Sequence, residues 1–201
     1  LDLNDKEKVK KLLRMNNVPT PRGSVSKGYH GALLCVEEIG FPVVVKPRAG
    51  SLSRHTTCDI KANGELKEAV RVAQIISREI IVEEFISGDV YRATVVNGEV
   101  VGVCKREAPN VVGDGVHTVR ELVHMKNQDP LRGEMHQKNT TLHKIQLGDQ
   151  AEALLVEQGV GHADIPAAGK KLYLHSKVIL SCGADIHDVT DTVHPDNILL
   201  F

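Results

Sequence analysis

The clearest candidate for a chemical role is a lysine that directly follows a run of valines. Lys46 lies in the segment VVVKP at 43–47, and three consecutive β-branched residues predict a strand that is buried on both faces. An unpaired lysine beside such a strand is costly, so Lys46 needs an anionic partner. That partner is either a carboxylate of the chain, which makes a structural ion pair, or an anionic ligand.

The loop after this predicted strand is rich in small and hydroxyl-bearing side chains. It has the sequence AGSLSRHTT and contains Gly50 and Arg54. Backbone N–H groups of such a loop, together with an arginine, can surround a phosphate. The chain contains neither GxxxxGK[ST] nor GxGxxG, so neither common nucleotide-binding loop is present. An ordinary surface loop remains the alternative.

Two acidic residues lie at the end of another apolar segment. Glu83 and Glu84 follow the apolar residues IIV and are followed by Phe85 and Ile86. A carboxylate or a backbone carbonyl beside apolar side chains can bind the amino group and the ring of an adenine. Without further context, the residues favour an ordinary strand end.

Ten histidines raise the question of a metal site. The densest group of potential ligands consists of Asp185, His187, Asp188, Asp191, His194 and Asp196. On one strand, Asp185 and His187 would share a face, but HExxH is absent and 191–195 is typical of a turn. We therefore assign no metal ligand. A zinc store that depends on His187 and His194 remains an alternative.

The elements that must position these groups follow from the spacing of apolar residues. Helical spacing predicts helices at 5–16, 29–39, 64–77, 119–127 and 149–159, with Asn4 and Asn63 as N-caps of the first and third. Apolar runs predict strands at 43–47, 57–60, 79–85, 171–174 and 178–180. Asn97-Gly98 predicts a hairpin turn, and the polar stretch 129–141 predicts a surface loop. The pattern indicates an α+β fold.

Composition excludes several classes of protein. The 201 residues are 41% hydrophobic and 25% charged, which is typical of a folded globular chain. A net charge of -1, without a long Lys/Arg run, disfavours a nucleic-acid partner. No apolar stretch approaches the roughly 20 residues of a membrane span, and the charged start is not a signal peptide. The four cysteines form no CxxC pair, so we expect a cytoplasmic protein.

The order of the sequence segments along the chain resembles that of an ATP-grasp ligase. The likeness is carried by DKEKVKKLL, NVPTPRG, EEIGFPVVVKP and IIVEEFISGDVYR, and it covers essentially the whole chain. Two further segments, VVGDGVHTVREL and DVTDTVHPDN, are specific to ATP-grasp ligases of the cyanophycin synthetase type.

The resemblance implies an ATP-grasp fold of two α+β lobes, which we expect at 1–86 and 87–201. We expect the second lobe to be incomplete, with the family's magnesium ligands beyond this chain. ATP would bind with Mg²⁺ on its phosphates. The residues implied for ATP binding are Lys6, Lys46, Glu83, Glu84, Phe85, Ile86 and Asp89. Those implied for catalysis are Lys46, Arg54 and Arg106, with Arg54 in a loop that covers the phosphates.

The implied reaction forms an amide at the expense of ATP. A carboxylate takes the γ-phosphate, an amine attacks the acyl phosphate, and ADP and phosphate are released. In the cyanophycin synthetase type, the product has an aspartate backbone with arginine side chains. The partners would be ATP and an amino-acid or peptide substrate, and we expect the full-length protein to be a homo-oligomer. Two alternatives remain: a glutathione- or dipeptide-type ligase, and a non-catalytic nucleotide-binding or assembly module.

Five positions depart from the family's pattern. Ser53 and His55 stand where glycines are expected, Ile179 replaces an asparagine, and Ala184 replaces a glycine. Val90 occupies the place of an acid, with Asp89 one residue earlier. Because glycine permits close approach and positive φ, the first two changes predict weaker closure over the phosphates.

Overall fold

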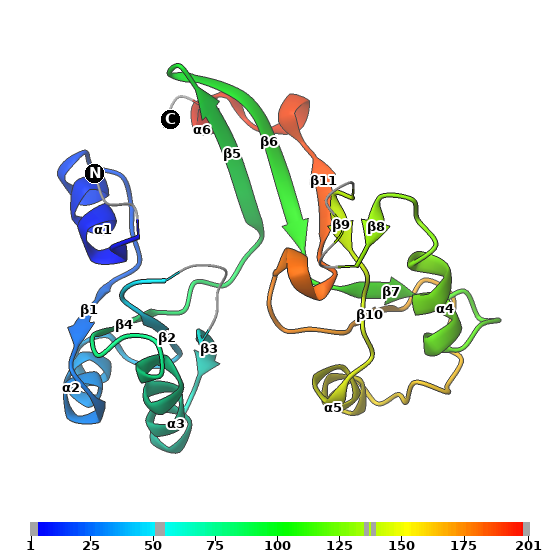
Figure 1. Cartoon of the computed structure of the whole chain (residues 1–201), viewed down its shortest axis with the longest axis horizontal. Helices are drawn as coiled ribbons and strands as arrows, with labels where there is room; N and C mark the ends of the chain where they lie inside the picture. The colour runs from blue at the N-terminus through cyan, green and yellow to red at the C-terminus, as the bar shows by residue number, and fades with distance from the viewer. Residues whose placement is uncertain (1–3, 51–54, 135–136, 138–139, 199–201) are drawn as a thin grey trace. The chain divides into compact units, whose positions relative to one another are not determined.

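The computed structural model describes residues 4–50, 55–134, 137 and 140–198. The chain divides into two compact units, Leu1–Gly88 and Asp89–Phe201 (Figure 1). Ser53 and Arg54 lie outside the described residues. Among the described helices, none combines the length and the apolar character that crossing a membrane requires.

The first unit is built on a four-stranded antiparallel sheet with the strand order β1-β4-β2-β3. Its strands are β1 (Gly23–Ser26), β2 (Val43–Pro47), β3 (Thr57–Ile60) and β4 (Ile80–Glu84). Its helices are α1 (Lys6–Met15), α2 (Tyr29–Ile39) and α3 (Asn63–Gln74). The apolar spacing predicts all of these elements except β1, whose short sequence GSVS carries no strand signal.

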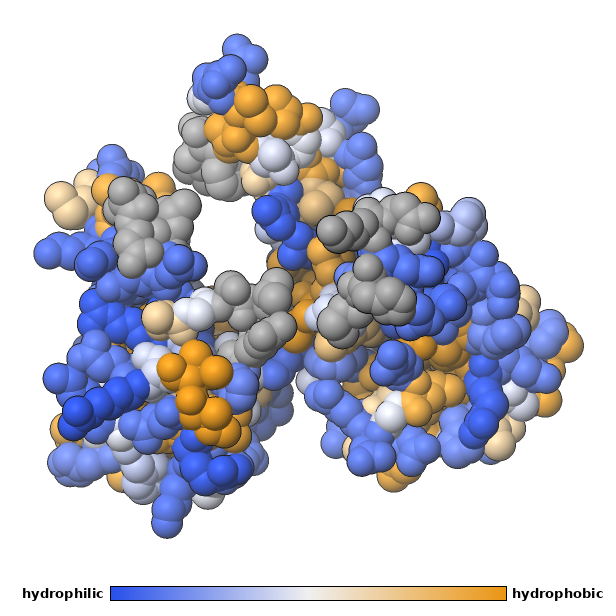
Figure 2. All heavy atoms as spheres, in the orientation of Figure 1, coloured by the Kyte–Doolittle hydropathy of each residue, from blue (hydrophilic) through white to orange (hydrophobic). Residues whose placement is uncertain are grey.

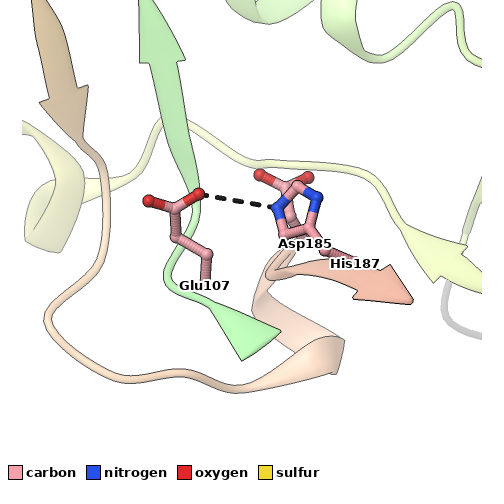
Figure 3. A group of neighbouring side chains, drawn as sticks. All are labelled: Glu107, Asp185 and His187. Carbon is pink, nitrogen blue, oxygen red and sulfur yellow. Dashed lines mark ion pairs between the residues drawn. The ribbon is translucent and has the colours of Figure 1, made fainter. Parts of the chain in front are cut away.

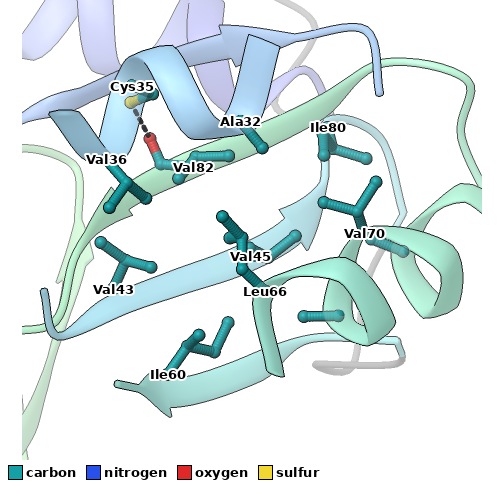
Figure 4. Packing of buried hydrophobic residues seen from close by; sticks show 12 residues of the cluster. Ala32, Cys35, Val36, Val43, Val45, Ile60, Leu66, Val70, Ile80 and Val82 are labelled. Carbon is teal, nitrogen blue, oxygen red and sulfur yellow. Dashed lines mark hydrogen bonds between the residues drawn. The ribbon is translucent and has the colours of Figure 1, made fainter. Parts of the chain in front are cut away.

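The core of this unit lies between the sheet and helices α2 and α3 (Figure 4). Its fully buried members come from alternate strand positions and from one face of each helix, and include Ala32, Val43, Val45, Leu66, Ala73, Ile80 and Val82. Because side chains alternate across a strand, Lys46 and Glu83 project from the opposite face of β2 and β4. The apolar pattern therefore fixes the face on which these two charged groups lie.

Both predicted N-caps of this unit were wrong by one residue. Asp5, rather than Asn4, caps α1, because its backbone is extended and its carboxylate accepts hydrogen bonds from the first turn. Asn63 is the first helical residue of α3, and Ala62 at the N-cap offers no side-chain bond. The start of α3 instead uses Glu65, whose carboxylate accepts from the N–H of Lys61 at 2.9 Å.

The second unit contains three small sheets among its described residues. Strand β6 (Glu99–Glu107) pairs with β5 (Val90–Val96) and with β11 (Asp185–Asp188). Strand β7 (Asn110–Val112) pairs with β10 (Lys171–Tyr173), and β8 (Arg132–Gly133) runs parallel to β9 (Leu142–His143). The predicted hairpin is confirmed: Asn97 and Gly98 connect β5 to β6 with φ of 52° and 83°.

The helices of this unit are α4 (Val119–Lys126), α5 (Asp149–Glu157) and the short α6 (Pro195–Ile198). A second core joins α4 and α5 to β7 and β10. The visible faces of both units are mainly hydrophilic, with apolar patches between polar regions (Figure 2).

Two predictions for this unit were wrong. The segment 178–180 is not a strand, because a 3-10 turn, η1 (Leu180–Cys182), begins there and ends at Gly183 with φ of 93°. The stretch 129–141 is not wholly a surface loop, because it contains β8 with a buried Arg132. A second 3-10 turn, η2 (Thr190–Thr192), follows β11.

Candidate functional site

The charged groups of the first unit meet at Glu83. Its carboxylate accepts from Lys46 Nζ through Oε1, and from Lys10 Nζ through Oε2 at 2.9 Å. The Glu83 side chain is only 7% exposed, and β4 places it directly opposite Val44 in the sheet register. The anionic partner that the sequence requires for Lys46 is therefore a carboxylate of the chain itself.

The side chain of Lys6, the first residue of α1, reaches the end of β2. Its Nζ donates to the carbonyl oxygens of Pro47 at 3.1 Å and Gly50 at 2.7 Å. Burial lowers the pKa of Lys6, and the positive charge of Lys46 lowers it further. The two lysines therefore repel each other, and a phosphate beside both would relieve that repulsion.

Two residues that sequence reasoning missed hold Lys6 in place. The Arg48 guanidinium donates to the Asp5 carboxylate at 2.8 and 3.1 Å, and to Glu79 at 2.6 Å. Asp5 also accepts from two backbone N–H groups in the first turn of α1. The backbone N–H of Lys6 donates to the Arg48 carbonyl at 3.2 Å. These bonds join the start of α1 to the end of β2.

The Asp5–Arg48 ion pair should make the stability of the folded chain depend on pH in the acidic range. The Arg48 hydrogen bonds lower the pKa of Asp5 from 3.8 to about 2. A carboxylate with a depressed pKa stabilises the folded state above its ordinary pKa, and that contribution is lost as the pH falls through the folded-state value. We therefore expect the wild type to lose more stability than Asp5→Asn between pH 3.8 and about 2.

Urea denaturation across this pH range measures the difference. Asn keeps the N-cap but removes the charge, so Asp5→Asn isolates the ion pair. Asp5→Ala is the matched control, because it also removes the cap and should be less stable than Asp5→Asn at every pH. Parallel pH profiles for the wild type and Asp5→Asn would contradict the assignment.

The residues predicted to bind adenine lie at and after the end of β4. The Glu84 carboxylate accepts from the backbone N–H and from Nε of Arg22, both at 2.8 Å, and these bonds lower the pKa of Glu84. Phe85 donates its N–H to the carbonyl oxygen of Pro42, just before β2, at 3.0 Å, and the Ile86 side chain is exposed. The Glu84 carboxylate therefore already has a partner in Arg22, whereas the Ile86 side chain is open to solvent.

The remaining predicted site residues are Asp89, Arg106 and Arg54. Asp89 and Arg106 belong to the second unit, where Asp89 accepts from Lys105 Nζ at 2.6 Å. Arg106 is half-buried on β6, and its Nε is buried without a hydrogen-bond partner in the described part of the chain. Arg54 lies outside the described residues. His55, at a position where the resemblance predicts glycine, has φ of 57°, a conformation that favours glycine.

A second group of titratable residues lies in the second unit (Figure 3). Glu107, Asp185 and His187 bring potential ligand atoms within 4.8 Å of one another, and Asp185 and His187 both lie on β11, a strand that the apolar pattern did not predict. Asp185 accepts from Lys126 Nζ at 2.6 Å and also from Arg132, and Glu107 accepts from Lys171 Nζ at 2.7 Å. Three cations thus face two carboxylates, and this charge balance disfavours a divalent cation. His194 is not a member of the group.

A cavity of about 490 Å³ lies elsewhere in the second unit. Its lining comes from β5, β6 and the segment 189–198, and includes Tyr91, Val103, Val193 and Ile198. The described residues predicted for ATP do not line it. We therefore base the candidate site on the lysines of the first unit rather than on this cavity.

Comparison with known proteins identifies the family. The sequence profile described as the RimK-like ATP-grasp domain matches residues 3–115, more than half of the chain. The chain belongs to the RimK-like ATP-grasp family. This ATP-grasp chain is 39% identical to the cyanophycin synthetase of Trichormus variabilis over 197 residues, which is 98% of the chain and 22% of that protein.

Relatives of a second type are nearly as similar. This ATP-grasp chain is 35% identical to the glutathione biosynthesis bifunctional protein of Clostridium perfringens, over 97% of the chain and 25% of that protein. The crystal structure of a bifunctional glutathione synthetase from Pasteurella multocida matches with a TM-score of 0.64 and 32% identity, over 98% of this chain and 27% of that one. The chain therefore spans about a quarter of the length of these relatives.

ATP-grasp ligases use ATP and Mg²⁺, so the lysine site must be tested for a fit to the metal. Magnesium prefers carboxylate and water oxygens as ligands. The Glu83 carboxylate already accepts from two lysines, and the Glu84 carboxylate accepts from Arg22. The described residues of the lysine site do not by themselves fit a resident magnesium ion.

Proposed function

We propose that this chain is the nucleotide-binding part of an ATP-dependent carboxylate–amine ligase of the cyanophycin synthetase type. The observation that carries the proposal is the convergence of Lys6 and Lys46 at the end of β2, beside the backbone of the following loop. Lysines held in place before the reaction can stabilise the charge of phosphoryl oxygens without further reorganisation. The lobes proposed for this function are 1–86 and 87–201.

In the proposed reaction, a substrate carboxylate attacks the γ-phosphorus of ATP, and ADP leaves. An amine then attacks the carbonyl carbon of the acyl phosphate, phosphate leaves with the bonding electron pair, and the amine loses a proton. Lys6 and Lys46 bind the phosphates and hold them in line. Phe85 and Ile86 contact the adenine, Asp89 contacts the ribose, and Arg54 and Arg106 stabilise the transferred group.

We propose aspartate and arginine as the substrates. The cyanophycin synthetase type implies aspartate and arginine, whereas the glutathione type implies glutamate, cysteine or glycine. The segments VVGDGVHTVREL and DVTDTVHPDN, which resemble the cyanophycin synthetase type, support the first set, together with the 39% identity to the cyanophycin synthetase of Trichormus variabilis. ADP release by the full-length protein, measured with each amino-acid set, separates the two. We also propose a cytoplasmic location, because the four cysteines lie far apart in the sequence and form no CxxC pair.

Calorimetric titration with a non-hydrolysable ATP analogue and Mg²⁺ tests nucleotide binding directly. We expect the wild type to bind, and Lys46→Ala to lose about 30-fold or more in affinity, equivalent to about 2 kcal/mol for a charge-assisted contact. Lys11→Ala removes an exposed lysine from α1 and should leave the affinity unchanged.

Two results would contradict the proposal. Equal affinities for the wild type and Lys46→Ala would remove Lys46 from the site. A wild type that binds no analogue would show that the chain is not an ATP site by itself, and would favour the non-catalytic assembly module.

A further inference from the structure

Glu83 accepts hydrogen bonds from both Lys10 and Lys46, and this sharing indicates how Lys46 can leave Glu83 to bind an anion. This inference rests on the proposed function. We propose that Lys10 is a positioning residue that stays bound to Glu83 and thereby frees Lys46 to bind a nucleotide phosphate. In this arrangement Glu83 holds Lys46 in place while the site is empty, and Lys10 neutralises Glu83 once Lys46 has moved.

The geometry assigns different parts to the two lysines. Each contacts its own oxygen of the Glu83 carboxylate, so one can leave without breaking the bond to the other. The Lys10 side chain is 8% exposed, whereas that of Lys46 is 22% exposed. Of the two, Lys46 is the one whose charge lowers the pKa of Lys6. Lys6 itself lies beside the loop that begins at Arg48. Lys46 is therefore the lysine that can reach a ligand.

The energetic argument depends on the burial of Glu83. Removing the only cation from a buried carboxylate leaves an uncompensated charge, which is strongly unfavourable. If Lys46 were the sole partner, each phosphate contact would carry that cost. Lys10 removes this cost, because it neutralises Glu83 after Lys46 has left. The Asp5–Arg48 ion pair holds the start of α1, the helix that carries Lys10.

Titration of variants with the ATP analogue and Mg²⁺ tests this inference. In Lys10→Met, Glu83 retains Lys46, so we expect the affinity to fall by about tenfold as the released fraction of Lys46 falls by the same factor. Lys10→Met combined with Glu83→Gln should recover the affinity, because a neutral amide does not retain Lys46. Lys10→Arg keeps the charge and should bind as the wild type does. Lys11→Met is the matched control and should also bind normally.

Two outcomes of the titration would overturn the inference. An unchanged affinity in Lys10→Met would show that Lys46 needs no second cation on Glu83. A loss that Glu83→Gln does not reverse would show that Lys10 contacts the nucleotide itself. Circular dichroism of each variant establishes that it is folded. If Lys10→Met does not fold, Lys10→Arg still tests the inference, because a reduced affinity in that variant would contradict it.

A measurement without ligand distinguishes this inference from the proposed function. The urea midpoints of Lys10→Met, Lys46→Met and the double variant should be non-additive, since only the double variant leaves Glu83 without a cation. Additive shifts would overturn the sharing of Glu83, whatever the chain binds. A wild type that binds no analogue would overturn the proposed function and the release step, while a non-additive cycle would show that the ion-pair sharing is real.

Discussion

Replacing Arg132 with methionine is expected to destabilise the second unit by about 3 kcal/mol, because removal of one partner from a buried ion pair leaves a buried charge. The Arg132 side chain is 1% exposed and binds the Asp185 carboxylate through Nη2. Its Nη1 donates to the carbonyl oxygens of His143 at 2.8 Å and Gly183 at 3.0 Å. One guanidinium thus joins β8, β9, β11 and the end of η1.

Asp185 would keep part of its network in this variant. Lys126 Nζ donates to it at 2.6 Å and Asn110 Nδ2 at 3.1 Å, so the loss should be at the lower end of what breaking a buried pair costs. Two backbone carbonyls would lose their donor, and buried acceptors without a partner are costly. Methionine fills much of the volume of the arginine stem, so the effect reports polar contacts more than a cavity.

Urea denaturation measures this loss, and hydrogen exchange locates it. Amide protection should fall within 89–198 and stay unchanged within 4–88. Lys144→Met is the matched control, because Lys144 pairs with Glu134 at 3.1 Å in an exposed position, and such a pair contributes at most about 1 kcal/mol. A loss below about 1 kcal/mol in Arg132→Met would contradict the importance of the network.

Replacing Leu66 with alanine is expected to destabilise the first unit by about 3 kcal/mol, within the range of about 2–5 kcal/mol that buried Leu→Ala changes cost. Leu66 is 0% exposed and packs from α3 into the core that covers β2 and β4. The change removes apolar surface from the core and leaves a cavity between the helix and the sheet. Since the same core sets the face from which Lys46 projects, nucleotide affinity should fall as well.

The matched control for this prediction lies on the neighbouring helix. Leu34 is exposed on α2, so Leu34→Ala should change the stability by less than about 0.5 kcal/mol. Urea denaturation of both variants, with hydrogen exchange over 4–88, makes the comparison. Equal losses in the two variants would be inconsistent with the core described for this unit.

The sequence by itself determined the elements whose signals are local. Apolar periodicity located α2, α4, β2 and β4, and Asn97-Gly98 located the hairpin, because each pattern lies within a few consecutive residues. The sequence also established that Lys46 needs an anionic partner, since a lysine at the end of a valine strand is costly when unpaired. The order of segments indicated the ATP-grasp family, which the comparisons confirm.

Only the tertiary structure decided which charges meet. Lys10 and Glu83 are 73 residues apart, and Arg132 and Asp185 are 53 apart. Period and spacing describe neighbours along the chain, so they could not select Glu83 for two lysines or place Arg132 in the interior. Charged residues are ordinarily predicted to be exposed, and only a partner brought from a distant strand makes their burial tolerable. For the same reason β1 and the Asp5–Arg48 anchor became visible only in the folded chain.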